Sequence, residues 1–551
     1  MLRTAFTTLL VVSYLARAYA QTWCGKNYMA GSPVIPPGGQ FPISATSSSP
    51  LLAFRCAPAI KPYLPEDVPT LSSFIIDTPI TKSEITGAAP ISLPGHGSLG
   101  SVAVTVSVDG RSLATGVVPL NATKFELPFS LAGFSPRAEA YNVTCTAEYS
   151  SSSLSKPQQF STGAALSLLP DPPAGRSVTK MDLRTGALLA KPATGNGGSY
   201  ETVFPIGFYT NFAGYLDSNL TLLNVLKEQG FTVHPVPTFD NLTALDLILD
   251  RMQELGLYLM YDMRWTYMND TAVTEEVNRI KNRPNLLLWY TGDEPDGTSD
   301  PLNATSHAYD LIYSLDGYHP VSLVLNCEDY FWTQYTSGSD IVMQDTYMIS
   351  NNVTFSNQWE TPCTLDYGCC GCDDCKGNFE DISTRMDDFA ERLWDNGWDR
   401  TKAVWTVPQA FGNDTYWTRQ PTGKEYIVQA VLGINHGGLG VVAWNDPTTP
   451  EIKASASALA LALPTMQDFI LSPSASFAHV SSGQVDVGVW TVGARSLVLA
   501  TNLNYAEATL PLASVPGVEG KSVQQVFDSG ASFAGGKFVF ESTGTGGFIV
   551  S

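Results

Sequence analysis

The stretch NLLLWYTGDEPDG, from Asn285 to Gly297, decides how the middle of this 551-residue chain folds. It begins with the apolar run LLLWY, which lacks alternation, as in a strand buried on both faces of a parallel sheet. It ends with Asp293, Glu294 and Asp296 around a proline, although only 15% of all residues are charged. An apolar strand that carries acids at its carboxyl end is typical of a (β/α)8 barrel, where functional residues follow the strands.

The pattern repeats between residues 200 and 472, where apolar runs alternate with amphipathic segments. The expected strands are residues 203–209, 231–237, 257–263, 285–291, 320–326, 340–346, 403–409 and 439–445. The expected helices are residues 220–230, 244–256, 275–283, 306–317 and 386–397. The unit after the fifth strand, residues 326–339, has the weakest helical pattern. Eight such units within about 270 residues fit the size of a barrel.

The sequences on both sides of the barrel region have the pattern of antiparallel sheets. Residues 21–195 contain alternating runs such as SVAVTVSV, separated by Gly, Pro and Ser clusters, which predicts a β-sandwich. Strand-like runs return after residue 472. We therefore expect an α/β protein with an N-terminal β-sandwich domain at 21–195, a TIM barrel at 200–472 and a smaller C-terminal β-sandwich domain at 473–551.

Residues 1–20 are expected to be a signal peptide, because an apolar stretch follows Arg3 and Ala18-Tyr19-Ala20 fits a cleavage site. Eight glycosylation motifs agree with secretion: Asn121, Asn142, Asn219, Asn241, Asn269, Asn303, Asn352 and Asn413. The net charge of -21 disfavours nucleic acid and anionic membranes as partners. We expect a secreted monomer, extracellular or associated with a cell wall.

Nine cysteines in an oxidising compartment are expected to form disulfides rather than a zinc site, so no metal is expected. Six of them are expected to form three bridges that tie one long loop: Cys327, Cys363, Cys369, Cys370, Cys372 and Cys375. Of the remaining three, Cys24, Cys56 and Cys145, one is expected to stay unpaired.

The residues that follow the expected strands are rich in acids and aromatic rings. Phe239 and Asp240 follow the second strand, and Asp345 ends the sixth. The candidates for substrate binding are Asp262, Arg264, Trp265, Asp293, Glu328, Tyr347, Gln409, Trp417, Trp444 and Asn445. Carboxyl pairs with aromatic platforms suit sugar chemistry. The chain lacks a Gly-x-Ser-x-Gly elbow, an HExxH motif and a phosphate-binding glycine loop, and no cofactor is expected.

GDEP, residues 292–295, resembles the Asn-Glu-Pro or Asp-Glu-Pro signature that retaining barrel glycosidases carry after strand four. The resemblance implies that Glu294 is the general acid/base. The flanking domains resemble those of multidomain secreted glycosidases, and the whole chain resembles uncharacterised secreted fungal proteins of the (trans)glycosidase superfamily. The resemblance implies a glycoside hydrolase that cleaves O-glycosidic bonds in an extracellular or cell-wall polysaccharide or other glycan. Its expected partner is therefore a polysaccharide or oligosaccharide substrate.

The chain departs from that pattern at strand seven, where the resemblance implies a nucleophilic Glu and the sequence has Gln409. Asp345 is the best substitute, with Glu294 as a protonated acid and Asp345 ionised. Other barrel glycosidases pair strands four and six with the strand-four residue as nucleophile, so the reverse assignment stays open. Two further alternatives are a structural Asp345 bonded to Arg264 or a tyrosine, and an inactive barrel that acts as a secreted carbohydrate-binding or cell-wall protein.

Overall fold

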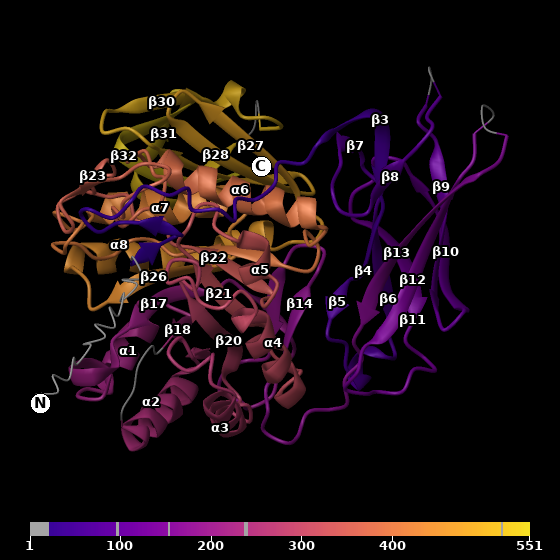
Figure 1. Ribbon diagram of the computed structural model, residues 1–551, viewed down its shortest axis with the longest axis horizontal. Coiled ribbons are helices and arrows are strands. Elements are labelled where there is room, and N and C mark those ends of the chain that lie inside the picture. The colour runs from indigo at the N-terminus through magenta and orange to yellow at the C-terminus, as the bar shows by residue number, and fades with distance from the viewer. Residues whose placement is uncertain (1–20, 95–97, 152–154, 236–240, 519–521) are drawn as a thin grey trace, which may run out of the picture.

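The computed structural model describes residues 21–94, 98–151, 155–235, 241–518 and 522–551 (Figure 1). The expected signal peptide, the last two residues of the second expected strand, and the candidates Phe239 and Asp240 lie outside the described residues. Within the described ranges, no helix is long and apolar enough to cross a membrane.

Eight parallel strands form the central barrel. They are β17 (Ile206–Thr210), β18 (Val233–Pro235), β19 (Tyr258–Asp262), β20 (Leu286–Asp293), β21 (Val321–Leu325), β22 (Ile341–Gln344), β25 (Ala403–Thr406) and β26 (Val441–Asp446). Their order around the sheet is β17-β26-β25-β22-β21-β20-β19-β18. At the seam the Thr232 N–H donates to the Ile206 carbonyl over 2.9 Å. Gly207 permits this approach, because a Cβ there would lie 1.9 Å from the Val233 carbonyl oxygen. All eight expected strands are confirmed in a nearly closed barrel.

Helices pack around the barrel strands (Figure 1). They are α1 (Thr221–Glu228), α2 (Leu242–Leu255), α3 (Asp270–Ile280), α4 (Ala304–Leu315), α5 (Trp332–Thr336), α6 (Glu380–Asn396), α7 (Gly423–Asn435) and α8 (Pro450–Ile470). The five expected helices are confirmed. The weak fifth unit contains only the short α5. Each longer helix buries an apolar stripe against the strands, as Leu245, Ile248 and Met252 of α2 do.

The N-terminal region forms antiparallel sheets at the right of Figure 1. Their strands are β3 (Thr46–Ala53), β4 (Arg55–Pro58), β6 (Leu71–Asp77), β7 (Ile80–Ser83), β8 (Ala88–Pro90), β9 (Ser101–Val108), β10 (Arg111–Pro119), β11 (Phe125–Ser130), β12 (Tyr141–Tyr149) and β13 (Gln158–Leu166). The sheet β10-β9-β12-β13 and the sheet β11-β6-β4 share one buried core, as a sandwich does. A third sheet has the order β7-β3-β8.

A fourth sheet, β16-β15-β14-β5, closes the amino end of the barrel. Its strands are β5 (Ile60–Lys61), β14 (Thr179–Asp182), β15 (Ala187–Ala190) and β16 (Glu201–Val203). Its apolar side chains share a core with residues inside the barrel. Lys61 also forms an ion pair of 2.8 Å with the buried Asp340 carboxylate. The sheet therefore leaves the carboxyl ends of the barrel strands uncovered.

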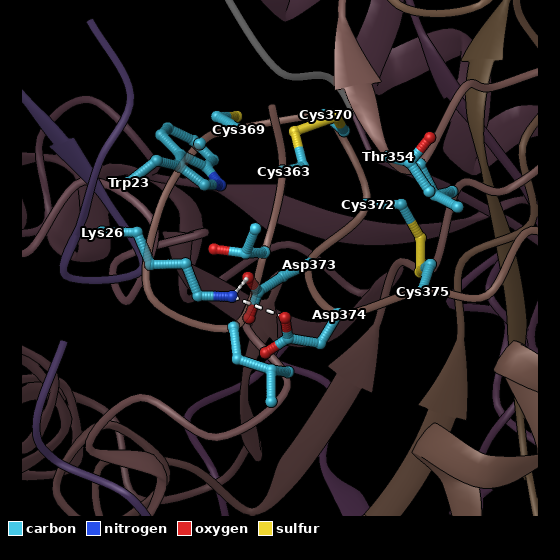
Figure 2. A pocket seen from close by; sticks show the side chains of 15 residues that line it. Trp23, Lys26, Thr354, Cys363, Cys369, Cys370, Cys372, Asp373, Asp374 and Cys375 are labelled. Atoms are coloured by element: carbon cyan, nitrogen blue, oxygen red, sulfur yellow. Dashed lines mark hydrogen bonds and ion pairs between the residues drawn. A yellow bond between two sulfur atoms is a disulfide. The ribbon is translucent and has the colours of Figure 1, made fainter. Parts of the chain in front are cut away.

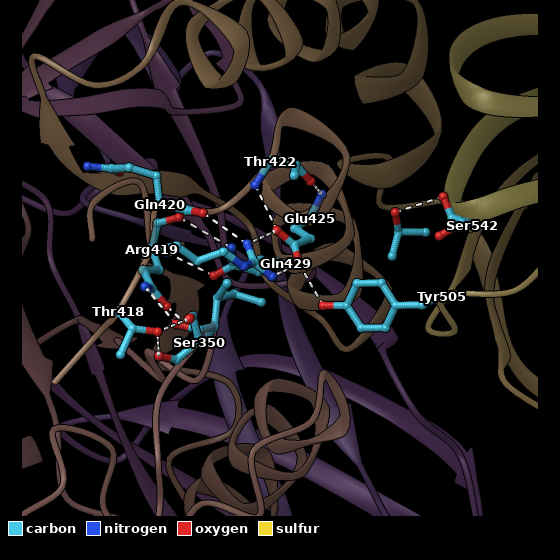
Figure 3. A network of polar contacts seen from close by, with 12 residues as sticks. Ser350, Thr418, Arg419, Gln420, Thr422, Glu425, Gln429, Tyr505 and Ser542 are labelled. Carbon is cyan, nitrogen blue, oxygen red and sulfur yellow. Dashed lines mark hydrogen bonds and ion pairs between the residues drawn. The ribbon is translucent and has the colours of Figure 1, made fainter. Parts of the chain in front are cut away.

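The C-terminal strands form one antiparallel sheet against α7 and α8. They are β27 (Ser476–Ser482), β28 (Val485–Val492), β29 (Arg495–Asn502), β30 (Ala508–Pro511), β31 (Val523–Ala534) and β32 (Lys537–Val550). Trp490, Leu497 and Ile549 pack into the barrel's outer core, whereas the other face has a core of its own. Figure 3 shows a polar link at this junction, where the Glu425 carboxylate accepts hydrogen bonds from Arg419 (2.7 Å) and Tyr505 (2.6 Å).

The segment Gln21–Asn27, which we call the N-terminal strap, lies at the carboxyl end of the barrel and not in the N-terminal sheets. It contains β1 (Thr22–Trp23) and β2 (Lys26–Asn27). A disulfide between Cys24 and Cys327, 303 residues apart, fixes the strap to the segment that follows β21. The strap was expected within the N-terminal β-sandwich. Its seven residues are too few for an alternation of apolar and polar residues to show which sheet or surface it joins. The exact domain boundaries stay a prediction.

The disulfide prediction was wrong in its pairing. The bridges are Cys24–Cys327, Cys56–Cys145, Cys363–Cys370 and Cys372–Cys375. Only two of the three bridges expected in the later loop exist, Cys369 is a free thiol, and all three early cysteines are paired. The even count of the later group was misleading, because Cys327 follows β21 and meets the strap there. The loop itself contains the short hairpin β23 (Phe355–Ser356) and β24 (Thr361–Pro362).

Candidate active site

Glu294 and Asp345 lie next to each other at the carboxyl ends of β20 and β22. The Asn326 amide, just after β21, donates from Nδ2 to Glu294 Oε1 over 2.9 Å and to Asp345 Oδ1 over 3.3 Å. These two oxygens therefore cannot be farther apart than the sum of the two distances. A hydrogen bond also joins the two carboxyl groups. They are thus in contact, whereas the carboxyl groups of inverting glycosidases lie about 6.5–9.5 Å apart. The three side chains form one constellation from three adjacent strands.

The environment favours one shared proton between the two carboxyl groups. Burial raises the pKa of Glu294, while a hydrogen bond from Asp345 and the nearby Arg264 charge oppose the rise. Burial, followed by the negative charge of Glu294, raises the pKa of Asp345 well above its usual range. Two buried carboxyl groups in contact cannot both ionise at low cost. Burial and the Glu294 charge therefore favour the protonated form of Asp345 beside an ionised Glu294.

Arg264 holds a second pair of carboxylates beside this constellation. Its guanidinium donates to Asp262 over 2.7 Å and forms an ion pair with Asp293. The Arg264 guanidinium carbon lies 4.8 Å from the Trp444 ring centre and 5.1 Å from that of Tyr209. Burial opposes protonation of Arg264, but the Asp262 and Asp293 charges raise its pKa overall. Asp293 is therefore committed to Arg264 and is not free to act as an acid.

The third acid of the opening stretch, Asp296, has a structural role. Its buried carboxylate accepts hydrogen bonds from the backbone N–H groups of Cys327 (2.8 Å), Gly297 (2.9 Å) and Asn326 (3.3 Å). Burial raises its pKa to about 7 despite these donors. Asp296 thus fixes the backbone of Asn326, whose side chain holds both Glu294 and Asp345.

A cavity of about 430 Å³ opens over the carboxyl pair, and we call it the mouth cavity. It is lined by Trp23, Asp293, Glu294, Asn326, Asp345, Tyr347, Cys369, Gly371, Phe411, Asp414, Tyr416, Trp417, Trp444 and Asn445. Seven of these lining residues were candidates from the sequence. The aromatic wall is tight, since the rings of Phe411 and Trp417 lie 4.7 Å apart and the Trp417 indole N–H donates to the Tyr347 carbonyl over 2.8 Å.

Sequence reasoning missed Trp23 and Asn326, which lie next to cysteines that pair. The Trp23 indole N–H donates to Asn326 Oδ1 over 2.9 Å, which leaves the Asn326 Nδ2 donors for the two carboxyl groups. Gly297 makes room for the ring, because a Cβ there would lie 2.5 Å from it. Figure 2 shows Trp23 beside Cys369, and Lys26 of the strap between Asp373 and Asp374, at 2.7 Å from each. The strap is thus held by charge, disulfide and packing.

Several candidates do not line the mouth cavity. Asp262 and Arg264 lie behind it, where they support Asp293. Trp265 is 77% exposed on the surface. The Glu328 backbone N–H donates to Asp373. Each of these residues follows a strand by the expected offset, but the turn after the strand directs its side chain elsewhere.

Gln409, expected at the cavity as a substrate-binding residue, is fully buried and bonded to backbone. Its Nε2 donates to the carbonyls of Phe411 (3.1 Å) and Ile349 (3.2 Å), and its Oε1 accepts from the Ile349 N–H over 2.9 Å. The amide therefore connects the two loops that follow β22 and β25. Gln409 is absent from the lining of the mouth cavity.

No family model matches the sequence, and no curated protein matches it. Solved structures similar to this one include a β-D-glucuronidase of Dictyoglomus thermophilum, at 12% identity and a TM-score of 0.31 over 72% of this chain and 62% of that one. They also include a GH30 endoxylanase of Clostridium papyrosolvens (11%, TM-score 0.39, 64% and 97%) and an α-amylase of Geobacillus thermoleovorans (11%, TM-score 0.39, 63% and 98%). This chain thus spans under two thirds of the glucuronidase, and these values carry no information on the reaction.

Proposed function

We propose that the protein is a glycoside hydrolase whose catalytic residues are Glu294 and Asp345. The observation that carries this proposal is the contact of both carboxyl groups with one Asn326 amide at the floor of a cavity walled by Tyr347, Trp417 and Trp444. A carboxyl pair supplies the acid and the nucleophile for cleavage at an anomeric carbon, and aromatic rings bind the apolar faces of sugars.

The protonation pattern supports Asp345 as the acid and Glu294 as the nucleophile, the reverse of the first expectation. In the first step the Asp345 proton moves to the glycosidic oxygen, the bond from that oxygen to the anomeric carbon breaks, and Glu294 forms an ester with that carbon. In the second step Asp345, now ionised, accepts a proton from water, whose oxygen displaces Glu294. The short separation supports this retaining course, because an inverting site needs room for water between carboxyl groups.

Export from the cell is part of the same proposal. Four disulfides are typical of proteins that mature in an oxidising compartment. The eight asparagines of the glycosylation motifs are all exposed, as an acceptor site requires. Glycosylation itself stays a prediction. The substrate class that fits is a polysaccharide or oligosaccharide met outside the cell.

The test is hydrolysis of aryl α- and β-glycosides and of plant and fungal wall polysaccharides by the wild type, Glu294→Gln and Asp345→Asn. Each variant is expected to lose activity by about 10³-fold or more while keeping the wild-type fold. Glu254→Gln, a change at an exposed acid, is the matched control and is expected to keep full activity. Proton NMR of the first product is expected to show retained anomeric configuration. Binding of glycans without release of reducing ends would instead indicate a carbohydrate-binding protein.

Roles are separated by azide rescue of Glu294→Ala and Asp345→Ala. An azide that replaces the nucleophile attacks the substrate directly and yields a glycosyl azide of inverted configuration. An azide that assists a variant without its acid/base attacks the glycosyl ester and yields the retained configuration. We expect inversion with Glu294→Ala and retention with Asp345→Ala, and the opposite pair of results would reverse the two assignments.

A further inference from the structure

A cluster of two histidines and one aspartate lies at the junction of the barrel and the C-terminal sheet, away from the mouth cavity. His436 follows α7, His479 lies on β27 and Asp486 lies on β28. His436 Nε2 lies 3.0 Å from Asp486 Oδ2, and His479 Nε2 lies 2.7 Å from the same oxygen. The three atoms all lie within 4.8 Å of one another. We infer that this cluster is a zinc site that ties the barrel to the C-terminal sheet.

The donor set and its spacing suit zinc. Imidazole nitrogens and a carboxylate oxygen bind this ion at about 2.0–2.2 Å, which places tetrahedral ligand atoms about 3.4 Å apart. The two separations from Asp486 Oδ2, 3.0 Å and 2.7 Å, are shorter than that value, so side-chain rotations that move the ligand atoms slightly apart accommodate the ion. A set with two imidazoles favours zinc over calcium or magnesium, which prefer oxygen ligands. His479 is 29% exposed, which leaves a path for the ion and a solvent-facing fourth position.

Groups around the three ligands hold them in position. Asp387 Oδ1 lies 2.7 Å from His436 Nδ1, so the ring presents Nε2 to the centre of the cluster. Asn435 Nδ2 donates to Asp486 Oδ1 over 2.8 Å and leaves Oδ2 for the ion. A carboxylate behind a ligating histidine is the usual outer contact of a zinc site. The two carboxylates also supply negative charge for a dication.

The backbone brings these residues together from three elements. His479 faces Gly488 across the β27–β28 pair, and Asp486 lies two residues from Gly488 on the same face. A Cβ at Gly488 would lie 2.6 Å from Asn435 Oδ1, so its absence lets the end of α7 reach the sheet. Zinc bound here would connect the C-terminal end of α7 to the hairpin directly, whereas the polar link through Glu425 and Tyr505 lies at the N-terminal end of the same helix.

The test is binding and stability of the full chain with zinc chloride at pH 7.5 after treatment with a chelator. Calorimetric titration is expected to show one saturable zinc equivalent, and Tm is expected to rise by about 2–3 °C at a free zinc concentration of about 100 Kd. Calcium chloride is expected to leave Tm unchanged. Cobalt(II) is expected to give the intense visible absorption of a tetrahedral site.

His479→Gln keeps a donor for Asp486 but lacks the second imidazole, and it is expected to bind zinc at least 10-fold more weakly than the wild type. His307→Ala is the matched control. His307 also lies next to an aspartate, with 2.9 Å between its Nε2 and the Asp270 carboxylate, but that pair is exposed and has no second imidazole. His307→Ala is expected to keep the wild-type affinity. Zinc binding of equal strength in His479→Gln, or no stoichiometric zinc binding by the wild type, would overturn the inference. Neither readout depends on glycoside hydrolysis.

Discussion

Trp23 donates a hydrogen bond of 2.9 Å to Asn326, although 303 residues separate the two in the chain. Asn326 in turn donates to Glu294 and Asp345, so a residue of the strap orients the amide that holds the carboxyl pair. The neighbouring residues, Cys24 and Cys327, are joined by a disulfide. The proposed active site is therefore completed by a segment that lies far from the barrel in the sequence. That distance is much longer than the window over which a periodic pattern predicts structure.

Trp23→Phe tests this positioning role. The variant keeps an aromatic wall but removes the indole N–H, so Asn326 can rotate away from the carboxyl pair. We expect kcat/KM on the best glycoside to fall about 5–10-fold, the cost of about one hydrogen bond, with a shifted acid limb in the pH profile. The control is Trp265→Phe, whose ring is exposed outside the cavity. An unchanged pH profile in Trp23→Phe would contradict the role.

Asp345→Asn is expected to stabilise the protein at neutral pH while it removes activity. The folded-state pKa of Asp345 lies above that of the unfolded chain, near 4, because of burial and the Glu294 charge. Its contribution to stability is therefore fully present below pH 4 and is lost as pH rises toward the folded-state pKa. Asparagine does not titrate. We expect Tm of the variant to exceed that of the wild type by about 1 °C at pH 7, for about 1 kcal/mol in a chain of this length, and to match it at pH 3.5. The same offset at both values would contradict the linkage.

Arg264→Met removes the only positive charge that contacts both Asp262 and Asp293 among the described residues. Breaking a buried pair leaves uncompensated carboxylates, so we expect a loss of about 3–5 kcal/mol in the free energy of unfolding at pH 7.5. The loss is expected to be smaller at pH 4.5, because Asp262, whose pKa burial raises to about 7, can then be neutral. Urea unfolding at both pH values measures this. Arg251→Met, in an exposed pair with Glu254, is expected to cost under about 1 kcal/mol.

Gln409→Glu is expected to destabilise the protein and to add no activity. The substitution replaces the Nε2 donor to the Phe411 and Ile349 carbonyls with a carboxylate oxygen at a fully buried position. We expect a loss of about 3 kcal/mol or more in urea unfolding, since a buried charge would face two acceptors. Gln334→Glu, at an exposed position, is the control. A gain in hydrolysis by Gln409→Glu would show that this position can act as a nucleophile after all.

Cys369 is expected to be the single reactive thiol of the chain, because the other eight cysteines form four disulfides. Its side chain lines the mouth cavity, so a maleimide attached there would fill the space above Glu294 and Asp345. We expect one label per chain by mass spectrometry and loss of glycoside hydrolysis. Burial raises the pKa of Cys369, so labelling is expected to be slow at neutral pH and faster as pH rises. Cys369→Ser is expected to be insensitive to the reagent.

The barrel strands and the position of Glu294 follow from local sequence. Residues 285–291 form a continuous apolar run, and such a run must lie between two covered faces. Because side chains at the carboxyl ends of parallel strands meet at one end of a barrel, Glu294, Asp345, Tyr347 and Trp444 could be placed near one another without coordinates. The same offset failed for Trp265 and Gln409, since one or two residues in a turn decide whether a side chain points into the cavity or away from it.

Contacts between distant parts of the chain required the tertiary structure. The pairing of Cys24 with Cys327 depends on where the strap meets β21, and the periodicity of neither segment encodes that contact. Three neighbouring acids also looked alike until their partners were known. Asp293 binds Arg264, Asp296 binds backbone N–H groups, and Glu294 faces Asp345 and the cavity. A carboxyl group's protonation and role depend on burial and on the nearest charges, which only the folded chain brings into contact.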